Sequence, residues 1–120
     1  MRSSRNFSLG ADGEGLASRF LIERGFRIVE RNYRFGRHGE IDIIAEKDDL
    51  VIFVEVKHRT TGRYGGALYS IGTKKKGSIK TVARAFLAAR PDLNLPRTTF
   101  RFDLISVGGG AIDWVEDMFR

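Results

Sequence analysis

Two acidic residues and one lysine, Asp42, Glu55 and Lys57, have types and spacing that could perform chemistry. They lie in two runs rich in β-branched and aromatic residues that flank the turn-forming pair Asp48–Asp49, and this pattern predicts a β-hairpin. A hairpin about that pair places Asp42 directly opposite Glu55. Lys57 follows Glu55 by two residues, so its side chain leaves the strand on the same face.

The register of this hairpin is supported by its apolar residues. When the numbers of facing residues sum to 97, one face of the hairpin is uniformly apolar. Its facing pairs are Ile41 with Val56, Ile43 with Val54, and Ala45 with Ile52. On the other face Glu40 lies opposite Lys57, beside the two facing acids. A plain structural alternative is therefore an ion pair between Glu40 and Lys57, with Asp42 and Glu55 merely exposed.

Two carboxylates that face each other across a strand pair need a positive charge between them. Side chains directly opposite have Cβ atoms about 5 Å apart, and two negative charges at that distance repel by roughly 3 kcal/mol at an effective dielectric constant of about 20. Oxygen ligands favour a hard divalent cation such as Mg²⁺ or Mn²⁺. An ammonium group beside such an ion, as at Lys57, can orient an attacking water or stabilise charge that develops on a phosphate.

The composition is typical of an ordinary globular domain and excludes several other classes. The 120 residues include 42% hydrophobic and 30% charged residues and no cysteine. Disulfides, thiolate zinc sites and thiol nucleophiles are excluded, and a reducing cytoplasm is expected. The longest strongly apolar run, Leu50 to Val54, is too short to span a membrane. We expect residues 1–10 to be a mobile basic arm and residues 11–120 to form a single domain.

Positive charge is concentrated in one part of the chain. Residues 57–91 contain nine Lys or Arg and no acid, whereas the remaining residues contain twelve basic (21 minus 9) and fifteen acidic ones. A segment of one sign and this length predicts an anionic partner, with nucleic acid ahead of a lipid surface. The candidate nucleic-acid-binding residues are Arg59, Arg63, Lys74, Lys75, Lys76, Lys80 and Arg84. For any single lysine, the alternative is a solvated helix face that happens to be cationic.

Hydrophobic periodicity and turn residues predict a small α/β fold. Helices are expected over residues 11–24, ending at Gly25, and over residues 73–89, closed by Pro91. Strands are expected over residues 26–35, 39–47, 50–59 and 99–107. The glycines at 108–110 turn the chain toward residues 111–115, so that one or two strands follow the second helix. This order predicts a sheet with one helix on each side or with both helices on one side.

The hairpin residues are similar to a known signature. Asp42, a gap of twelve residues and the run Glu55–Lys57 resemble the PD-(D/E)xK motif of restriction-endonuclease-like nucleases, although Ile41 stands where the motif has proline. The runs GEIDIIA and FVEVKHR resemble more closely the YraN-type family of small uncharacterised bacterial proteins, and the similarity covers about the whole chain after the arm. This resemblance implies a restriction-endonuclease-like fold, a small mixed β-sheet flanked by two main helices, with a divalent-metal site.

The same resemblance implies two further residues for that site. An acid on the first helix completes the metal site in such nucleases, and Glu14 is the matching position; it also lies in line with the apolar stripe through Ala17 and Leu21. The alternative is that Glu14 only favours the helix dipole. Lys75 is the lysine that the resemblance places near the metal. It belongs to three lysines at the N-terminal end of the second helix, where cations oppose the macrodipole and phosphate would relieve them.

Other polar residues are interpreted as structural. His58 follows Lys57 and points to the opposite face by alternation, where we expect it to pack or form hydrogen bonds. Asp103 is expected to pair with Arg101 or Arg97, and Trp114 to cover the core or the sheet.

These observations lead to two hypotheses of different classes. The first is a metal-dependent endonuclease acting on DNA, branched or single-stranded DNA included. In it Asp42 and Glu55 hold Mg²⁺ or Mn²⁺ with help from Glu14, Glu40 supports them, and Lys57 positions the nucleophilic water. The second is a non-catalytic nucleic-acid-binding module on the same scaffold, as part of a larger assembly. A short chain covers little duplex, so a homodimer or a protein partner is expected under either hypothesis. A third, a protein-binding domain, predicts affinity insensitive to salt.

Overall fold

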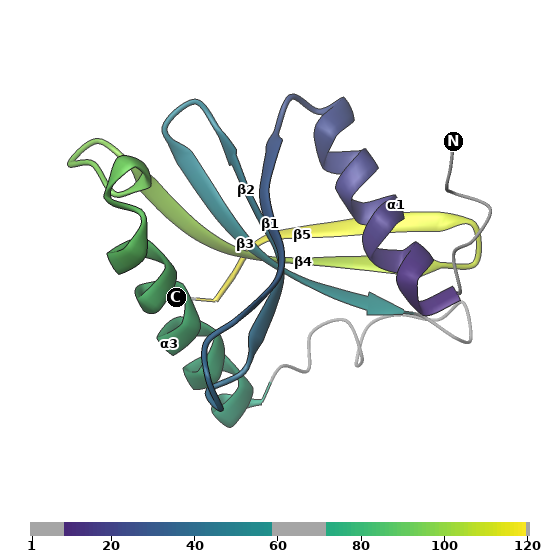
Figure 1. Ribbon diagram of the computed structural model, residues 1–120. Coiled ribbons are helices and arrows are strands. Elements are labelled where there is room, and N and C mark those ends of the chain that lie inside the picture. The colour runs from purple at the N-terminus through teal and green to yellow at the C-terminus, as the bar shows by residue number, and fades with distance from the viewer. Residues whose placement is uncertain (1–8, 59–71, 120) are drawn as a thin grey trace.

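The computed structural model describes residues 9–58 and 72–119, in which a five-stranded sheet carries one helix on each face (Figure 1). The elements in chain order are α1 (Leu9–Glu23), β1 (Arg27–Arg34), β2 (Glu40–Lys47), β3 (Leu50–His58), α3 (Thr73–Ala89), a short 3-10 helix (Pro91–Leu93), β4 (Thr99–Gly108) and β5 (Ala111–Phe119). This architecture confirms the predicted mixed sheet flanked by two main helices, and it is compatible with a restriction-endonuclease-like fold.

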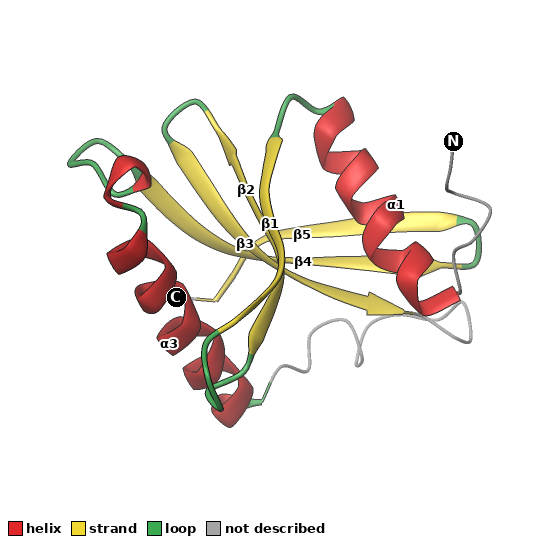
Figure 2. Cartoon of the chain, in the orientation of Figure 1, coloured by secondary structure: helices red, strands yellow, loops and turns green. Residues whose placement is uncertain are grey.

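The sheet is mixed because one strand pair is parallel. The strand order is β1-β2-β3-β4-β5, and β3 pairs with β4 in parallel whereas the other neighbours are antiparallel. Two parallel neighbours need a crossover connection, and the chain between β3 and β4 includes α3 (Figure 2). The crossover therefore lays α3 on one face of the sheet, and Lys75 in its first turn reaches Glu55 of β3.

Alternation along the central strands divides the core into two clusters. Ala17 and Leu21 of α1 pack with Ile52 and Val54 of β3 on one face. Phe53, the residue between them on β3, packs with Phe86 and other residues of α3 on the opposite face. Since successive side chains of a strand point to opposite faces, β3 is covered by a helix on each side.

The end of α1 has a hydrogen-bonding pattern that its sequence favours. Gly25 has a φ of 93°, its N–H donates to Ile22 O, and the N–H of Phe26 donates to Leu21 O, both at 3.0 Å. This is a Schellman motif, which requires a residue in the left-handed region and therefore favours glycine. Phe26 then enters the same apolar cluster as Leu21, so the cap also directs the chain into β1.

Most predicted elements are confirmed, and only two of them differ from the predicted bounds by more than one residue at an end. The helix α3 has the predicted bounds, but α1 begins at Leu9, so the last two residues of the predicted arm are helical. Residues 1–8 lie outside the described part of the chain. The strand β5 continues to Phe119 instead of ending at residue 115, because an irregularity lets it follow β4 further: Leu104 pairs with Val115, whereas Phe102 pairs with Phe119. Asp117, inside this irregularity, has a φ of 55°.

A buried carboxylate stabilises the irregular end of β5. Asp103 is fully buried and accepts hydrogen bonds from Arg101 Nε and Nη2, from Trp114 Nε1 and from the N–H of Asp117, each at 2.9 Å. The predicted pairing of Asp103 with Arg101 is confirmed, whereas Arg97 binds Asp49 instead. Trp114 packs edge-on against two phenylalanine rings, as expected of a residue that covers the sheet.

The described helices include none that is both long and apolar enough to cross a membrane.

Candidate active site

Strands β2 and β3 pair as predicted and then separate at the candidate site. Their register runs from Lys47 opposite Leu50 to Ile43 opposite Val54, which is the predicted sum of 97. One step further the N–H of Val56 donates to Asp42 Oδ2 at 2.8 Å. From there β3 continues beside β4, whereas the β1–β2 end turns toward α3 (Figure 1). A side-chain carboxylate thus replaces a backbone acceptor at the fork between the strands.

A change of face in β2 accompanies this fork and corrects one prediction. Ile43 packs in the cluster under α1, but Ile41, two residues away, packs in the cluster under α3. The predicted apolar face with Ile41 opposite Val56 is therefore wrong at that pair. The physical reason lies on β1, where Asn32 stands between residues paired to Ile43 and Ile41 and has a φ of 55°. A left-handed residue changes the direction of the side chains that follow it, so the alternation breaks here although the register of the two strands continues. The register shift of this pair lies between Ile28 and Glu30.

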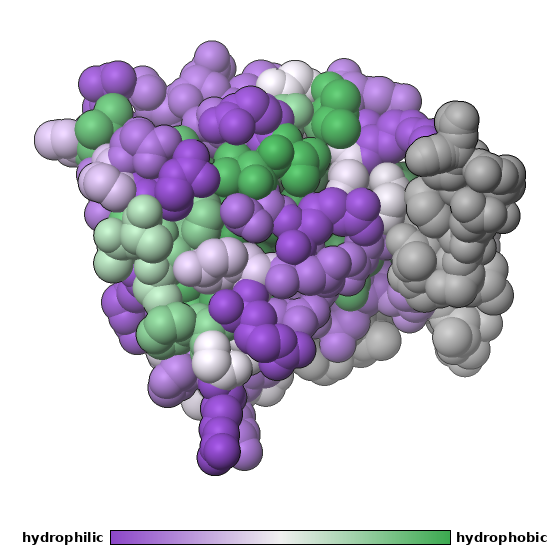
Figure 3. All heavy atoms as spheres, in the orientation of Figure 1, coloured by the Kyte–Doolittle hydropathy of each residue, from purple (hydrophilic) through white to green (hydrophobic). Residues whose placement is uncertain are grey.

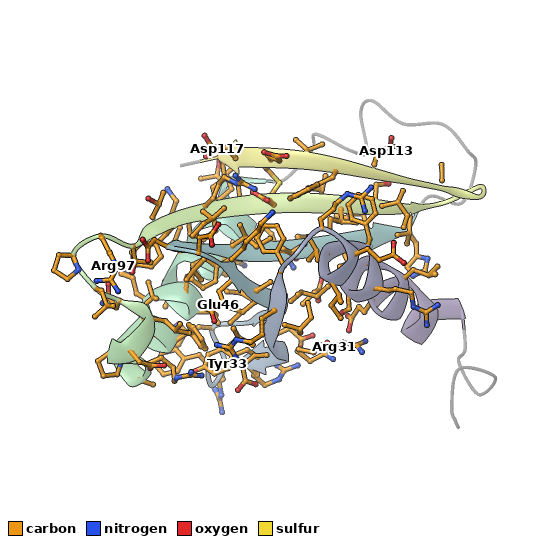
Figure 4. The ribbon with its side chains drawn as sticks, turned by 90° about the horizontal axis from the view of Figure 1, so that it is seen from above. Arg31, Tyr33, Glu46, Arg97, Asp113 and Asp117 are labelled. Atoms are coloured by element: carbon orange, nitrogen blue, oxygen red, sulfur yellow. The ribbon has the colours of Figure 1, made fainter. Side chains whose placement is uncertain are left out.

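The same break sends two neighbouring side chains of β1 to opposite sides of the sheet. Arg31 lies on the side of α1 and Tyr33 on the side of α3 (Figure 4). Arg31 Nη2 is 3.5 Å from Glu14 Oε1 on α1, and the Tyr33 ring packs edge-on against Phe86 of α3. Asp42 lies next to this break, at the point where the two helices are both within reach of β2.

The electrostatic surroundings of Asp42 are unfavourable for a charged carboxylate. Partial burial raises its pKa from 3.8 to about 7, the hydrogen bond from Val56 opposes this, and the negative charges of Glu55, Glu14 and Glu40 add to it. The structure therefore brings four acids from α1, β2 and β3 into one neighbourhood. Asp42 thus lies partly buried among like charges, which is a property expected of a site that receives a cation.

Glu55 is the most buried of these acids and is bound by a lysine from α3. Its residue surface is 8% exposed, and Lys75 Nζ lies 3.5 Å from its Oε2. Lys75 is in the first turn of α3 and its side chain is 49% exposed. The lysine that the family resemblance places near the metal site thus contacts one of its two central acids.

The outer acids are paired with arginines of β1, and Lys57 is not their partner. Arg34 Nη2 donates to Glu40 Oε1 at 2.9 Å, so the alternative ion pair between Glu40 and Lys57 is wrong. Arg34 and Glu40 face each other across the short β1–β2 connection, which favours their pairing over one with β3. Lys57 is partly buried, and its side chain forms neither an ion pair nor a hydrogen bond with another residue of the described ranges.

Glu14 is positioned by a close contact between α1 and the end of β3. A Cβ atom at Gly13 would lie 2.1 Å from His58 Nε2, so the imidazole occupies the space that a larger residue would need. His58 points toward α1 as the alternation predicted, and it acts by packing. The absence of a side chain at Gly13 therefore lets α1 approach β3 and places the neighbouring Glu14 beside the fork.

The donor chemistry of the site fits a hard divalent cation, although the donors are not gathered around one point. Asp42 and Glu55 offer carboxylate oxygens, and mutual repulsion between the acids would fall when a cation binds. Over residues 9–58 and 72–119, no three His, Asp or Glu side chains are arranged to hold a metal ion. The residues thus match Mg²⁺ or Mn²⁺ in kind and charge, and Lys75 now provides the positive charge nearest to Glu55.

The basic residues of α3 fall into two groups. Lys74, Lys75 and Arg84 are exposed, whereas Lys76 and Lys80 place their ammonium groups 5.6 and 5.7 Å from the centroid of the Phe119 ring. These two lysines therefore also cover the end of β5, in addition to any contact with a ligand. Arg59 and Arg63 lie outside the described residues.

Two functional features escaped the reasoning from sequence. Arg31 and Arg34 of β1 form ion pairs with the outer acids Glu14 and Glu40. The pair of Arg34 with Glu40 could have been predicted, because the short β1–β2 connection places the two residues opposite each other. The contact of His58 with Gly13 could not have been found, because it depends on how closely α1 approaches the sheet.

Comparison with known proteins places the chain among relatives without an assigned activity. The model of the uncharacterised protein family UPF0102 matches residues 13–107. A UPF0102 protein of Chlorobaculum parvum is 43% identical over 105 residues, which cover 88% of this chain and 78% of the relative. A UPF0102 protein of Shewanella sediminis is 41% identical over 110 residues, which cover 92% of this chain and 90% of the relative. A UPF0102 protein of Burkholderia pseudomallei is 41% identical over 113 residues, which cover 93% of this chain and 75% of the relative.

Proposed function

This chain belongs to the uncharacterised protein family UPF0102, the YraN-type family that its hairpin motifs resemble, and we propose that it is a divalent-metal-dependent nuclease that hydrolyses phosphodiester bonds in DNA. The names of its relatives give no activity, so the proposal rests on the arrangement of this chain's own residues.

One observation carries the proposal: the fork between β2 and β3 keeps Asp42 partly buried among three other acids. Burial and like charge both oppose ionisation of Asp42 near neutral pH, so the arrangement costs stability. Such a cost is typical of sites that bind a cation or perform acid–base chemistry. The adjoining face of α3 has positive charge and no acid in its first turn, as expected where a phosphate chain approaches.

The acids and the lysine of the site have different roles in the proposed reaction. Asp42 and Glu55, with help from Glu14, hold Mg²⁺ or Mn²⁺ through carboxylate oxygens. When bound, the ion lowers the pKa of a coordinated water and neutralises charge on the scissile phosphate. Lys57 lies two residues after Glu55 on β3, and its amine orients the attacking water on the same face.

The lysines of α3 bind the DNA backbone. Lys75 neutralises Glu55 in the free protein, and with Lys74 it binds a phosphate when DNA is present. Arg84 extends this surface along α3. Each phosphate contact releases counterions from the DNA, so affinity should fall steeply as the salt concentration rises.

A second candidate function is a nucleic-acid-binding module without turnover. One observation favours it: three acidic or histidine side chains do not meet around a metal-sized point anywhere in the described ranges. In such a module Lys75 permanently neutralises Glu55, and the basic residues of α3 bind DNA without cleaving it.

The test is a cleavage and binding assay on plasmid, branched and single-stranded DNA in Mg²⁺ or Mn²⁺. We expect cleavage of at least one substrate, and a loss of roughly 100-fold or more in Asp42→Ala and in Lys57→Ala. Asp92→Ala and Lys47→Ala are matched controls, because both residues lie away from the fork. Salt-sensitive binding without cleavage of any substrate would favour the module instead. Cleavage that survives in Asp42→Ala would contradict the assigned site.

A further inference from the structure

The connection between β1 and β2 presents an exposed pair of aromatic rings. Phe35 is 42% exposed, which makes it one of the few large apolar residues on the described surface. The ring of His38, itself exposed, stacks on it with centroids 5.2 Å apart and planes inclined by 16°. The two rings therefore form a short stack in which one face of each ring is turned away from the other, and both residues are exposed.

The backbone of this connection is held in one shape by short hydrogen bonds. The N–H of Phe35 donates to Gly39 O at 3.1 Å, and the N–H of His38 donates to Phe35 O at 3.0 Å. Gly36 and Gly39 have φ values of 54° and 127°, in the region that favours glycine, so the tight connection suits its sequence. The rings are thus held in place before any ligand arrives, which reduces the entropic cost of binding one.

The ring pair lies beside the basic end of α3 and close to the candidate site. A Cβ atom built at Gly39 would lie 3.7 Å from Ser78 Cβ, so the connection touches the first half of α3. Figure 1 shows the two segments together at the lower tip of the molecule, where hydrophilic side chains gather (Figure 3). Along β2, Gly39 is three residues from Asp42, or about 10 Å of extended strand.

Cationic residues lie next to the two rings in the sequence and in the helix that the connection touches. Arg37 lies between them in sequence, is exposed, and makes no ion pair or hydrogen bond with a partner in the described ranges. Lys74 and Lys75 are on the adjacent turn of α3. Aromatic rings next to cations are the combination with which proteins bind single-stranded nucleic acid, because the rings stack on bases while the cations contact phosphates.

We propose that Phe35 and His38 form a stacking platform for an unpaired base of DNA, with Arg37 and the first lysines of α3 on the flanking phosphates. This inference rests on the proposed function and narrows its substrate to DNA that contains unpaired nucleotides. A base inside an intact duplex has both faces covered by its neighbours and cannot stack on a protein ring without leaving the helix. An unpaired base can stack on the exposed ring face, whatever its sequence.

The test compares binding of a labelled oligothymidylate with binding of a blunt-ended duplex, measured by fluorescence anisotropy without divalent ions so that no cleavage occurs. We expect Phe35→Ala to weaken binding of the oligothymidylate by roughly tenfold and binding of the duplex by less than about twofold. Phe35→Trp should retain the affinity of the original protein, and its added indole should be quenched by the oligothymidylate. Ile22→Ala, which removes another exposed large apolar side chain from α1, is the matched control and should change neither affinity.

The possible outcomes separate this inference from the proposed function. If Phe35→Ala weakens binding of both probes equally, or weakens binding of neither, the stacking platform is overturned and the nuclease proposal stands. Lack of quenching in Phe35→Trp would also overturn it. A protein that binds neither probe would overturn both proposals. Because Phe35 is exposed in a loop, Phe35→Ala should keep the melting temperature of the original protein, and this measurement excludes misfolding as the cause of a loss.

Discussion

Replacement of Asp42 by asparagine should stabilise the protein at neutral and alkaline pH. The pKa of Asp42 is raised from 3.8 to about 7 in the folded state, so the folded protein binds more protons than the unfolded chain between these values. The free energy of unfolding therefore falls as the pH rises through this interval, and it levels off above about pH 7. Asparagine removes the charge and keeps an oxygen that accepts the N–H of Val56.

The size of this effect follows from the same two pKa values. The pKa of Asp42 rises from 3.8 to about 7 on folding. At about 1.4 kcal/mol for each tenfold change in proton affinity, ionisation of Asp42 lowers the free energy of unfolding by at most about 4 kcal/mol. Asp42 is only partly buried, so water screens part of the repulsion from its neighbours. We expect Asp42→Asn to raise the free energy of unfolding by about 2 kcal/mol at pH 8 and by much less at pH 4.

Urea unfolding at a series of pH values measures this difference, and the fluorescence of Trp114 can follow it because the indole packs against Phe20 and Phe26. Asp92→Asn is the matched control. Its carboxylate is exposed, and a hydrogen bond from Arg90 lowers its pKa. This substitution should therefore slightly destabilise the protein at pH values above the ordinary pKa of an aspartate. If Asp42→Asn destabilises the protein at pH 8, or if its effect does not change with pH, the electrostatic account of the site is wrong.

Three further predictions concern other contacts of the site and its scaffold. Gly13→Ala should lower the free energy of unfolding by about 1–3 kcal/mol because its Cβ meets the His58 ring. Adding His58→Ala should recover most of that loss in a thermal melt, and an additive double variant would contradict the contact. Asp103→Ala should cost about 3–5 kcal/mol in urea unfolding, since it leaves buried donors unpaired; a loss below about 1 kcal/mol would refute this. Lys75→Met should raise Mn²⁺ affinity roughly two- to fivefold by calorimetry, because it frees Glu55. Lys74→Met should not, and equal effects would exclude a specific role for the ion pair.

The hairpin register could be predicted because two independent signals agree on it. The pair Asp48–Asp49 fixes the centre of the turn, and the apolar residues of both strands alternate about that centre as far as Ile43 and Val54. Likewise α3 could be bounded from sequence, because its periodicity begins after a glycine-rich stretch and is followed by Pro91. Where pattern and turn chemistry agree, local reasoning gives both the element and its register.

The part of the site that could not be predicted depends on residues distant in sequence. Ile41 changes face because Asn32 on the neighbouring strand adopts a left-handed conformation, which is one of several available to asparagine in a strand. Glu40 pairs with Arg34 instead of Lys57 because the strands separate before Lys57 reaches it. The approach of Lys75 to Glu55 depends on how the crossover lays α3 on the sheet, which periodicity alone does not specify.

Two of the three left-handed residues other than glycine in the described ranges, Asn32 and Asp117, lie in the two outermost strands of the sheet. Each interrupts the straight row of free N–H and C=O groups that an incoming strand would need, and charged side chains flank both. Irregular, charged borders of this kind discourage strands of separate molecules from joining into a continuous sheet. The left-handed Asn32 beside the fork therefore also protects the β1 edge of the sheet from aggregation. The Asp103 network, which holds the irregular end of β5, does the same for the opposite edge.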